Sequence, residues 1–256
     1  MNFLQTLPKT RILSSNAIKF LAAAFMLVDH VGFIFFPDAI LFRIVGRLSM
    51  PLFAFALSEG CRYTKNKAKH FALLFTLAAL CQIVYYFFDD GSLYMSILVT
   101  FSLSVLCIYA LQYFKKRLFD DSKTSEKILA GVLLLLTVGG TFALNQVLTI
   151  DYGFLGCMIP VFASLFDFRG INAPERLQKL DRLPIRVLCL GVGCLTFALS
   201  HLHDVPIAFY MLLALPILLL YSGEKGKLKT KYFFYVFYPL HLVVLEGIYL
   251  FVQAIG

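Results

Sequence analysis

The sequence is poor in charged residues, which make up only 15% of its 256 positions. A soluble domain of this length holds about 25%. Hydrophobic residues make up 60%. They fall in runs of about 17–24 residues between polar patches, a pattern typical of helices that cross a membrane. We therefore predict an all-α, multi-pass integral membrane helical bundle, in which residues 1–256 form a single membrane domain and no soluble domain is present.

The sequence also lacks the motifs of several enzyme classes. It has no Gly-x-x-x-x-Gly-Lys-Ser/Thr phosphate loop, no zinc-binding helix signature and no Gly-x-Ser-x-Gly nucleophile elbow. His201, His203 and Asp204 cluster in one loop, but a solvated turn explains them more simply than a metal site does. The cysteines lie in or beside apolar runs without Cys-x-x-Cys spacing, so we expect inert apolar side chains at Cys61, Cys81, Cys107, Cys157, Cys189 and Cys194.

Lys and Arg are absent from alternate loops between the apolar runs. The loops around Pro37, Asp89–Gly91, 148–151 and 201–205 hold none, whereas the intervening loops hold many. The positive-inside rule then predicts a cytoplasmic N-terminus in the inner membrane, so that the net charge of +8 indicates topology and not nucleic-acid binding. The runs predict nine membrane-spanning helices, near residues 17–36, 40–61, 70–88, 94–114, 128–147, 150–167, 185–200, 205–222 and 232–254. Eight or ten crossings stay open because the sixth run is short and could be re-entrant.

The first two predicted helices keep ionisable residues where hydrocarbon disfavours them: Lys19, Asp29, His30, Arg43, Arg47 and Glu59. Each costs roughly 2.5–3.5 kcal/mol on insertion scales, so a membrane helix keeps one mainly for pairing or for chemistry. His30 lies 13 residues beyond Ala17, or about 20 Å along a helix. Arg47, seven residues into the returning helix, reaches about the same depth.

The spacing of these residues predicts how they pair. Arg43 and Arg47 are four residues apart, which places two cations on one helix face. Asp29 points about 100° away from the neighbouring His30, so we expect it to pair with Arg43 or Arg47 rather than to orient the imidazole. The simpler alternative is that this pair only holds the helices together. Lys19 and Glu59 fall at a similar inner depth, and we predict an ion pair between them unless Lys19 extends to the headgroups.

The same residues suggest catalytic and cofactor-binding roles. His30 beside two arginines is a candidate general base, and Asp29 is a candidate catalytic partner. The cofactor-binding candidates are Arg43, Arg47, Lys19 and Glu59, because the cations suit a phosphate or a developing oxyanion. His241 and Glu246 lie in the last run beside Tyr238 and Pro239, where core packing is the simpler explanation.

Several segments of the sequence resemble the TraX family, whose namesake acetylates the N-terminus of conjugative pilin. They spread over most of the chain: Ile18-Lys19, Met26–Gly32, Arg43–Phe55, Glu59-Gly60, Tyr63–Asn66, Asp151–Gly153 with Gly156, and Phe234–Leu242. The resemblance implies a multi-pass transferase that uses acetyl-coenzyme A. More distantly, Lys19 and His30 resemble the basic residue and the catalytic His of membrane acyltransferases of the acyltransferase-3 type. Those enzymes usually have Arg at the position of Lys19, and ten helices.

The predicted function is therefore an integral-membrane acyltransferase. It would move acetyl from acetyl-coenzyme A to an amine or hydroxyl within or across the membrane, on a protein N-terminus, a glycan or a small molecule. The partners expected are acetyl-coenzyme A, this acceptor and membrane lipid, with no nucleic acid and no metal. One alternative is a transporter of an anionic solute, for which we find neither paired halves nor broken helices. Another is a non-catalytic accessory subunit of an envelope assembly, whose buried charges would be satisfied only in a complex.

Overall fold

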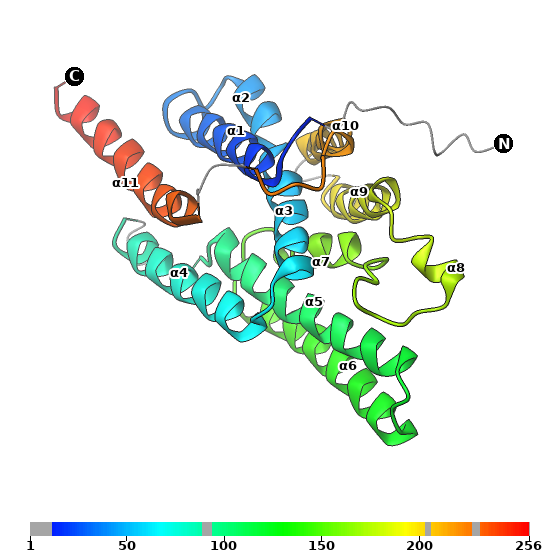
Figure 1. The fold of residues 1–256 in the computed structure, drawn as a ribbon. Coiled ribbons are helices and arrows are strands. Elements are labelled where there is room, and N and C mark those ends of the chain that lie inside the picture. The colour runs from blue at the N-terminus through cyan, green and yellow to red at the C-terminus, as the bar shows by residue number, and fades with distance from the viewer. Residues whose placement is uncertain (1–11, 89–93, 203–205, 227–230, 256) are drawn as a thin grey trace. The chain divides into compact units, whose positions relative to one another are not determined.

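The computed structural model describes residues 12–88, 94–202, 206–226 and 231–255, and the elements of this part of the chain are helical (Figure 1). Two isolated backbone bridges, Leu13 with Tyr221 and Met95 with Ile150, are its extended pairings. In order, the helices are α1 (Ser15–Phe35), α2 (Ile40–Gly46), α3 (Ser49–Tyr63), α4 (Lys67–Phe88), α5 (Ile97–Phe119), α6 (Thr124–Val147), α7 (Gly153–Ala163), α8 (Glu175–Gln178), α9 (Leu183–Ser200), the 3-10 helix η2 (Pro206–Leu213), α10 (Ala214–Leu219) and α11 (Lys231–Ile255).

Six helical segments among the described residues are long and apolar enough to cross a membrane: Ser15–Phe35, Ile40–Tyr63, Ile97–Phe119, Thr124–Val147, Leu183–Ser200 and Val236–Ala254. Two further predicted spans are shorter apolar helices, Gly153–Ala163 and Pro206–Leu219. The predicted run 70–88 forms α4, a helix of 22 residues. A helix satisfies its backbone hydrogen bonds internally, as hydrocarbon requires. The prediction of an all-α multi-pass membrane bundle is confirmed.

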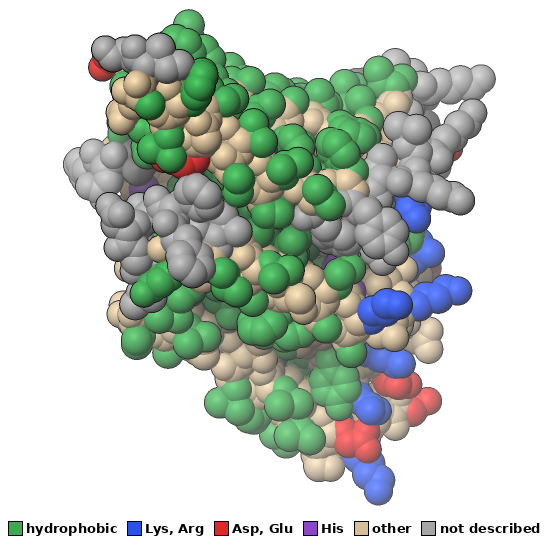
Figure 2. Space-filling view, turned by 90° about the vertical axis from the view of Figure 1, so that its left-hand side faces the viewer, with side chains coloured by type: hydrophobic (Ala, Val, Ile, Leu, Met, Phe, Trp, Pro, Cys, Tyr) green, Lys and Arg blue, Asp and Glu red, His purple; other side chains and the backbone are tan. Residues whose placement is uncertain are grey.

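Apolar side chains form much of the molecular surface. Figure 2 shows them over most of the face that it draws, with Lys and Arg gathered at one edge. On α6, large side chains are more than half exposed, including Ile128, Leu135, Leu136 and Val147. An exposed apolar face of this extent is unfavourable in water but suits contact with lipid tails. These side chains are therefore the lipid-facing surface of the helix.

The second predicted span is broken, which the sequence analysis did not anticipate. α2 ends at Gly46, and α3 begins at Ser49 after a turn at Arg47 and Leu48. Pro51 explains the position of the break. It lies four residues after Arg47 and has no N–H to donate to the Arg47 carbonyl, and proline is favoured in the first turn of a helix, where this N–H has no intrahelical partner.

The chain divides into two compact units, and the boundary falls within α3 and at the start of η2. The first unit comprises residues 1–56 and 207–256. Within it, two backbone hydrogen bonds join the start of α1 to the segment after α10. Leu13 N–H donates to the Leu220 carbonyl at 3.0 Å, and Ser15 N–H donates to the Glu224 carbonyl at 2.8 Å. α11 packs along α1, where the Phe20 ring contacts Phe233 and Phe234.

The second unit comprises residues 57–206, in which α5 packs against α4, α6 and α7, and α7 packs against α9. Its two ends differ in charge. At one end, Thr100 Oγ1 donates to the Asp151 carbonyl, and Met95 exchanges backbone hydrogen bonds with Thr149 and Asp151. At the other end, Arg62, Lys115 and Arg186 contact the segment 164–181 or the end of α3. The loop 148–151, which has no Lys or Arg, and the segment 164–181, which has several, thus lie near opposite ends of α5. Lys9, Arg11, Asp89–Gly91, Lys227 and Lys229 lie outside the described residues.

Two glycines allow α1 and α2 to approach closely. A Cβ on Gly46 would collide with the Asp29 side chain, and a Cβ on Gly32 would collide with Phe42. Gly139 in the middle of α6 is a matched contrast, because a Cβ there meets nothing within 4 Å.

The expected result is that Gly46→Ala destabilises the protein by about 1–3 kcal/mol, because the added methyl group forces α1 and α2 apart. Gly139→Ala stabilises it by up to about 1 kcal/mol through helix propensity alone. Denaturant unfolding in detergent micelles measures both changes. Equal effects of the two substitutions would contradict the close approach.

Candidate functional site

His30 is held in one orientation by its own helix. Its Nδ1 lies 2.8 Å from the carbonyl oxygen of Met26, one turn earlier in α1. A carbonyl can only accept, so the hydrogen of the neutral ring is assigned to Nδ1, and Nε2 carries the lone pair. The ring is half-buried. An imidazole with a fixed orientation and a basic Nε2 fits the predicted role of a general base.

Asp29 and Arg43 form the predicted ion pair. Arg43 Nη1 lies 2.8 Å from Asp29 Oδ2, and the side chains are 26% and 20% exposed respectively. Arg43 Nη1 also lies 3.4 Å from the Asp29 backbone carbonyl, and its guanidinium lies over the Phe33 ring at 5.3 Å. The prediction that Asp29 pairs with one of the two arginines is confirmed. The guanidinium is thereby held at the turn of α1 that also carries His30.

The Asp29 carboxylate is engaged away from the imidazole. One oxygen pairs with Arg43, and the other, Oδ1, is buried against Gly46 without a hydrogen-bond partner among the described residues. A backbone carbonyl, and not Asp29, orients His30. Arg47 is half-buried in the turn after α2, where its N–H donates to the Arg43 carbonyl at 3.1 Å. The two arginines are thus one helical turn apart, as their spacing predicted.

His241 lies against His30, which the sequence analysis missed when it assigned this residue to core packing. The two ring centroids are 5.0 Å apart and the ring planes are inclined by 83°. His241 is only 6% exposed, and its Nδ1 lies 3.0 Å from the carbonyl oxygen of Phe237. Its ring also stacks on Phe237 and contacts Tyr238. The site of the first unit therefore contains two imidazoles, one from α1 and one from α11.

The predicted ion pair between Lys19 and Glu59 is wrong. Glu59 Oε1 accepts a hydrogen bond from Nη2 of Arg186, and both side chains are almost fully buried. Arg186 lies in the first turn of α9, close to the start of the predicted span 185–200. Lys19 lies in the first unit, half-buried on α1, with Lys225 as a charged neighbour.

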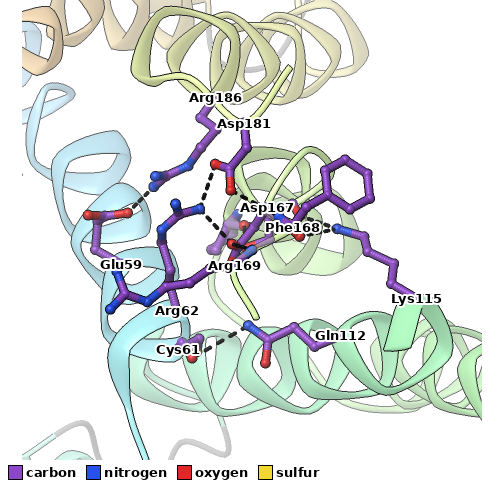
Figure 3. A network of polar contacts seen from close by, with 12 residues as sticks. Glu59, Cys61, Arg62, Gln112, Lys115, Asp167, Phe168, Arg169, Asp181 and Arg186 are labelled. Atoms are coloured by element: carbon purple, nitrogen blue, oxygen red, sulfur yellow. Dashed lines mark hydrogen bonds and ion pairs between the residues drawn. The ribbon is translucent and has the colours of Figure 1, made fainter. Parts of the chain in front are cut away.

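Glu59 belongs to a charged network of the second unit (Figure 3). Arg62 Nη1 bridges two carboxylates, at 2.5 Å from Asp167 and 2.6 Å from Asp181. Lys115 Nζ donates to the carbonyls of Ser164 and Asp167 at 2.7 and 3.1 Å. The network contains the carboxylates of Glu59, Asp167 and Asp181 and the cations of Arg62, Lys115 and Arg186. Arg169 lies beside them, with its backbone N–H donating to Asp167 and its guanidinium over the Tyr63 ring at 4.2 Å. These contacts hold α3, α5, α9 and the segment 164–181 together.

The described residues contain no group of three or more His, Cys, Asp or Glu that could hold a metal ion. His203 and Asp204 lie outside the described residues. All six cysteines are free thiols, five of them buried. Buried thiols among apolar side chains usually behave as small hydrophobic residues.

Comparisons with known proteins agree on a family. The family model described as TraX protein matches residues 14–249. A curated relative is the "Probable fimbrial assembly protein FimC, serogroup H1" of Dichelobacter nodosus, which is 26% identical over 267 residues that cover 94% of this chain and 97% of the relative. No solved structure matches.

Proposed function

Because the chain belongs to the TraX family, we propose that this membrane protein is an acyltransferase of the cell envelope that moves acetyl from acetyl-coenzyme A to an amine or hydroxyl acceptor. The observation that supports this most is the constellation on α1 and α2. His30 has a fixed ring with a basic Nε2, and Arg43 is held at the same turn of α1 by Asp29. A base and a cation on neighbouring helices are the two groups that acyl transfer to a nucleophile needs.

In the proposed reaction, His30 Nε2 removes the proton of the acceptor amine or hydroxyl as the acceptor attacks the thioester carbonyl. The carbonyl oxygen becomes an oxyanion, which the guanidinium of Arg43 stabilises by donating hydrogen bonds. The C–S bond then breaks, and the imidazolium returns its proton to the departing thiolate. Acetyl-coenzyme A and acceptor are thus converted to acetylated acceptor and free thiol, with no net proton change.

We propose that the N-terminus and the basic loops face the cytoplasm of a bacterial inner membrane, as the positive-inside rule predicts. The coenzyme would then approach from that side. Lys19 and Lys225 would attract its phosphates, and Arg47 would hold the thioester arm on the way to His30. Glu59 has no part in this role because its carboxylate is paired with Arg186.

Calorimetry of acetyl-coenzyme A binding to the purified, detergent-solubilised protein tests the proposal. We expect micromolar affinity that falls by about 10-fold or more in Arg43→Ala and in Arg47→Ala, because each substitution removes one charge-assisted contact. His30→Ala keeps the affinity, since its role is in the reaction. Lys179→Ala, at a lysine that is 62% exposed and paired with Glu175, is the matched charge control and leaves binding unchanged. A folded protein that binds no acetyl-coenzyme A would exclude the transferase.

A non-catalytic role in envelope assembly is the second candidate. The name of the relative from Dichelobacter nodosus, a probable fimbrial assembly protein, favours it. The accessory role predicts that the buried charges pair only with a partner protein. Two pairs do not fit this prediction, because Asp29–Arg43 and Glu59–Arg186 form within this chain. Capture of a pilus subunit by a protein that neither binds nor consumes acetyl-coenzyme A would establish this second candidate. The break at Arg47 gives the anion transporter one of its expected features, and uptake of an anion into liposomes tests it.

A further inference from the structure

His241 carries a buried polar atom that the mechanism above does not use. The side chain is 6% exposed, and Nδ1 is bound to the Phe237 carbonyl. Nε2 is buried and has no hydrogen-bond partner in the described part of the chain. Because the carbonyl at Nδ1 can only accept, Nε2 of the neutral ring carries a lone pair. Buried acceptors are almost always hydrogen-bonded, and a catalytic role is one reason for an orphan acceptor.

The neighbour of His241 makes this orphan significant. The His30 ring lies edge-on to it with the centroids 5.0 Å apart, and its Nδ1 is fixed in the same way, on the Met26 carbonyl. Two imidazoles in contact, each locked by its own helix, therefore both have a basic Nε2. The titratable groups around them are Asp29 and Arg43, which pair with each other, and Tyr238, whose ring centroid lies 5.6 Å from that of His241; Glu246 follows further along α11.

We propose that His241 is a second catalytic residue, which works with His30 as a proton-transfer pair. The inference rests on the proposed acyl transfer. As the acceptor nitrogen or oxygen bonds to the acetyl carbon, its proton passes to Nε2 of one imidazole. The second imidazole accepts a hydrogen bond from the imidazolium so formed. When the C–S bond breaks, the pair gives the proton to the thiolate, and both rings are neutral again.

A pair is better suited to this place than a single imidazole. A full positive charge on one ring inside an apolar bundle is costly, and Arg43 already supplies a cation at the same turn of α1. A neutral imidazole in contact shares the proton without adding charge, and a charge-assisted hydrogen bond between the rings is stronger than a neutral one. The Nε2 of His241 then has a partner during the reaction.

The test measures acetyl transfer from radiolabelled acetyl-coenzyme A to membranes of the source cell. The proteins compared are the wild type, His30→Gln, His241→Gln and the double variant. His70→Gln is the matched control, because His70 lies in the second unit and contacts Tyr109. We expect His241→Gln to lower the transfer rate by about 100-fold or more while the affinity for acetyl-coenzyme A stays the same. The double variant is no slower than His30→Gln alone, because groups that act as one unit are not additive.

A second readout separates a catalytic role from a packing role. Nitrogen NMR of protein labelled at histidine follows the titration of each ring, and each midpoint moves by about one pH unit or more when the other histidine is replaced. If the two rings titrate independently, the proton-transfer pair is rejected even where acetyl transfer is lost, because that loss is then an effect on packing. Full transfer by His241→Gln together with loss in His30→Gln also overturns the pair and leaves the proposed function intact. Absence of transfer by the wild-type protein rejects both.

Discussion

Replacing His30 by Gln is expected to lower the rate of acetyl transfer by about 100- to 10,000-fold, the usual contribution of a general base. Gln is polar and similar in size but has no basic nitrogen, so it removes the proton acceptor and keeps much of the packing. The imidazole of His30 is held by the Met26 carbonyl at Nδ1, whereas Asp29 and Arg43 pair with each other. The substitution therefore leaves the cation at this turn of α1 in place.

The measurement is label transfer under saturating acetyl-coenzyme A, so that a change in affinity does not enter the rate. The His70→Gln protein serves as the control for general effects of losing a histidine. A His30→Gln protein that is folded, inserted and as fast as the wild type would show that His30 is not the base.

Breaking the ion pair between Glu59 and Arg186 is expected to cause a large loss of stability. Arg186→Met leaves the Glu59 carboxylate, which is 4% exposed, without the partner of its Oε1. Removing one member of a buried pair costs about 3–5 kcal/mol, because the remaining charge stays buried. The double variant Glu59→Met with Arg186→Met is expected to recover most of this loss, since two apolar side chains of similar volume need no partner.

Denaturant unfolding in detergent micelles measures these changes. The exposed pair of Glu175 and Lys179 is the matched control, and Glu175→Met there costs less than about 1 kcal/mol. If the double variant loses as much unfolding free energy as Arg186→Met, the network needs charged groups at both positions. Mutual neutralisation of the two charges would then not explain the pair.

The sequence predicted those features of the fold and site that depend on neighbouring residues. Apolar runs located the helices because a bilayer fixes their length and composition. The pairing of Asp29 with an arginine followed from depth along two consecutive helices, and Arg43 provides it. The break after Gly46 also had a local signal in Pro51, but the hydropathy of an apolar run does not reveal a missing hydrogen-bond donor.

Contacts between distant segments were not predictable in this way. Arg186 pairs with Glu59 across 127 residues of sequence, and nothing local to either residue favours this pairing over Lys19. His241 is separated from His30 by nearly the whole chain, and in its own helix it resembles a packing residue between aromatic side chains. Only the packing of α11 on α1 shows that the two rings meet.

Transfer of label from radiolabelled acetyl-coenzyme A by the purified full-length protein in liposomes, with membranes of the source cell as acceptor, tests the proposed function most directly. The proposal predicts that label appears in an acceptor together with one equivalent of free thiol, and that both are lost in His30→Gln. Intact acetyl-coenzyme A after incubation with folded, inserted wild-type protein and these membranes would contradict it and would favour the role in envelope assembly.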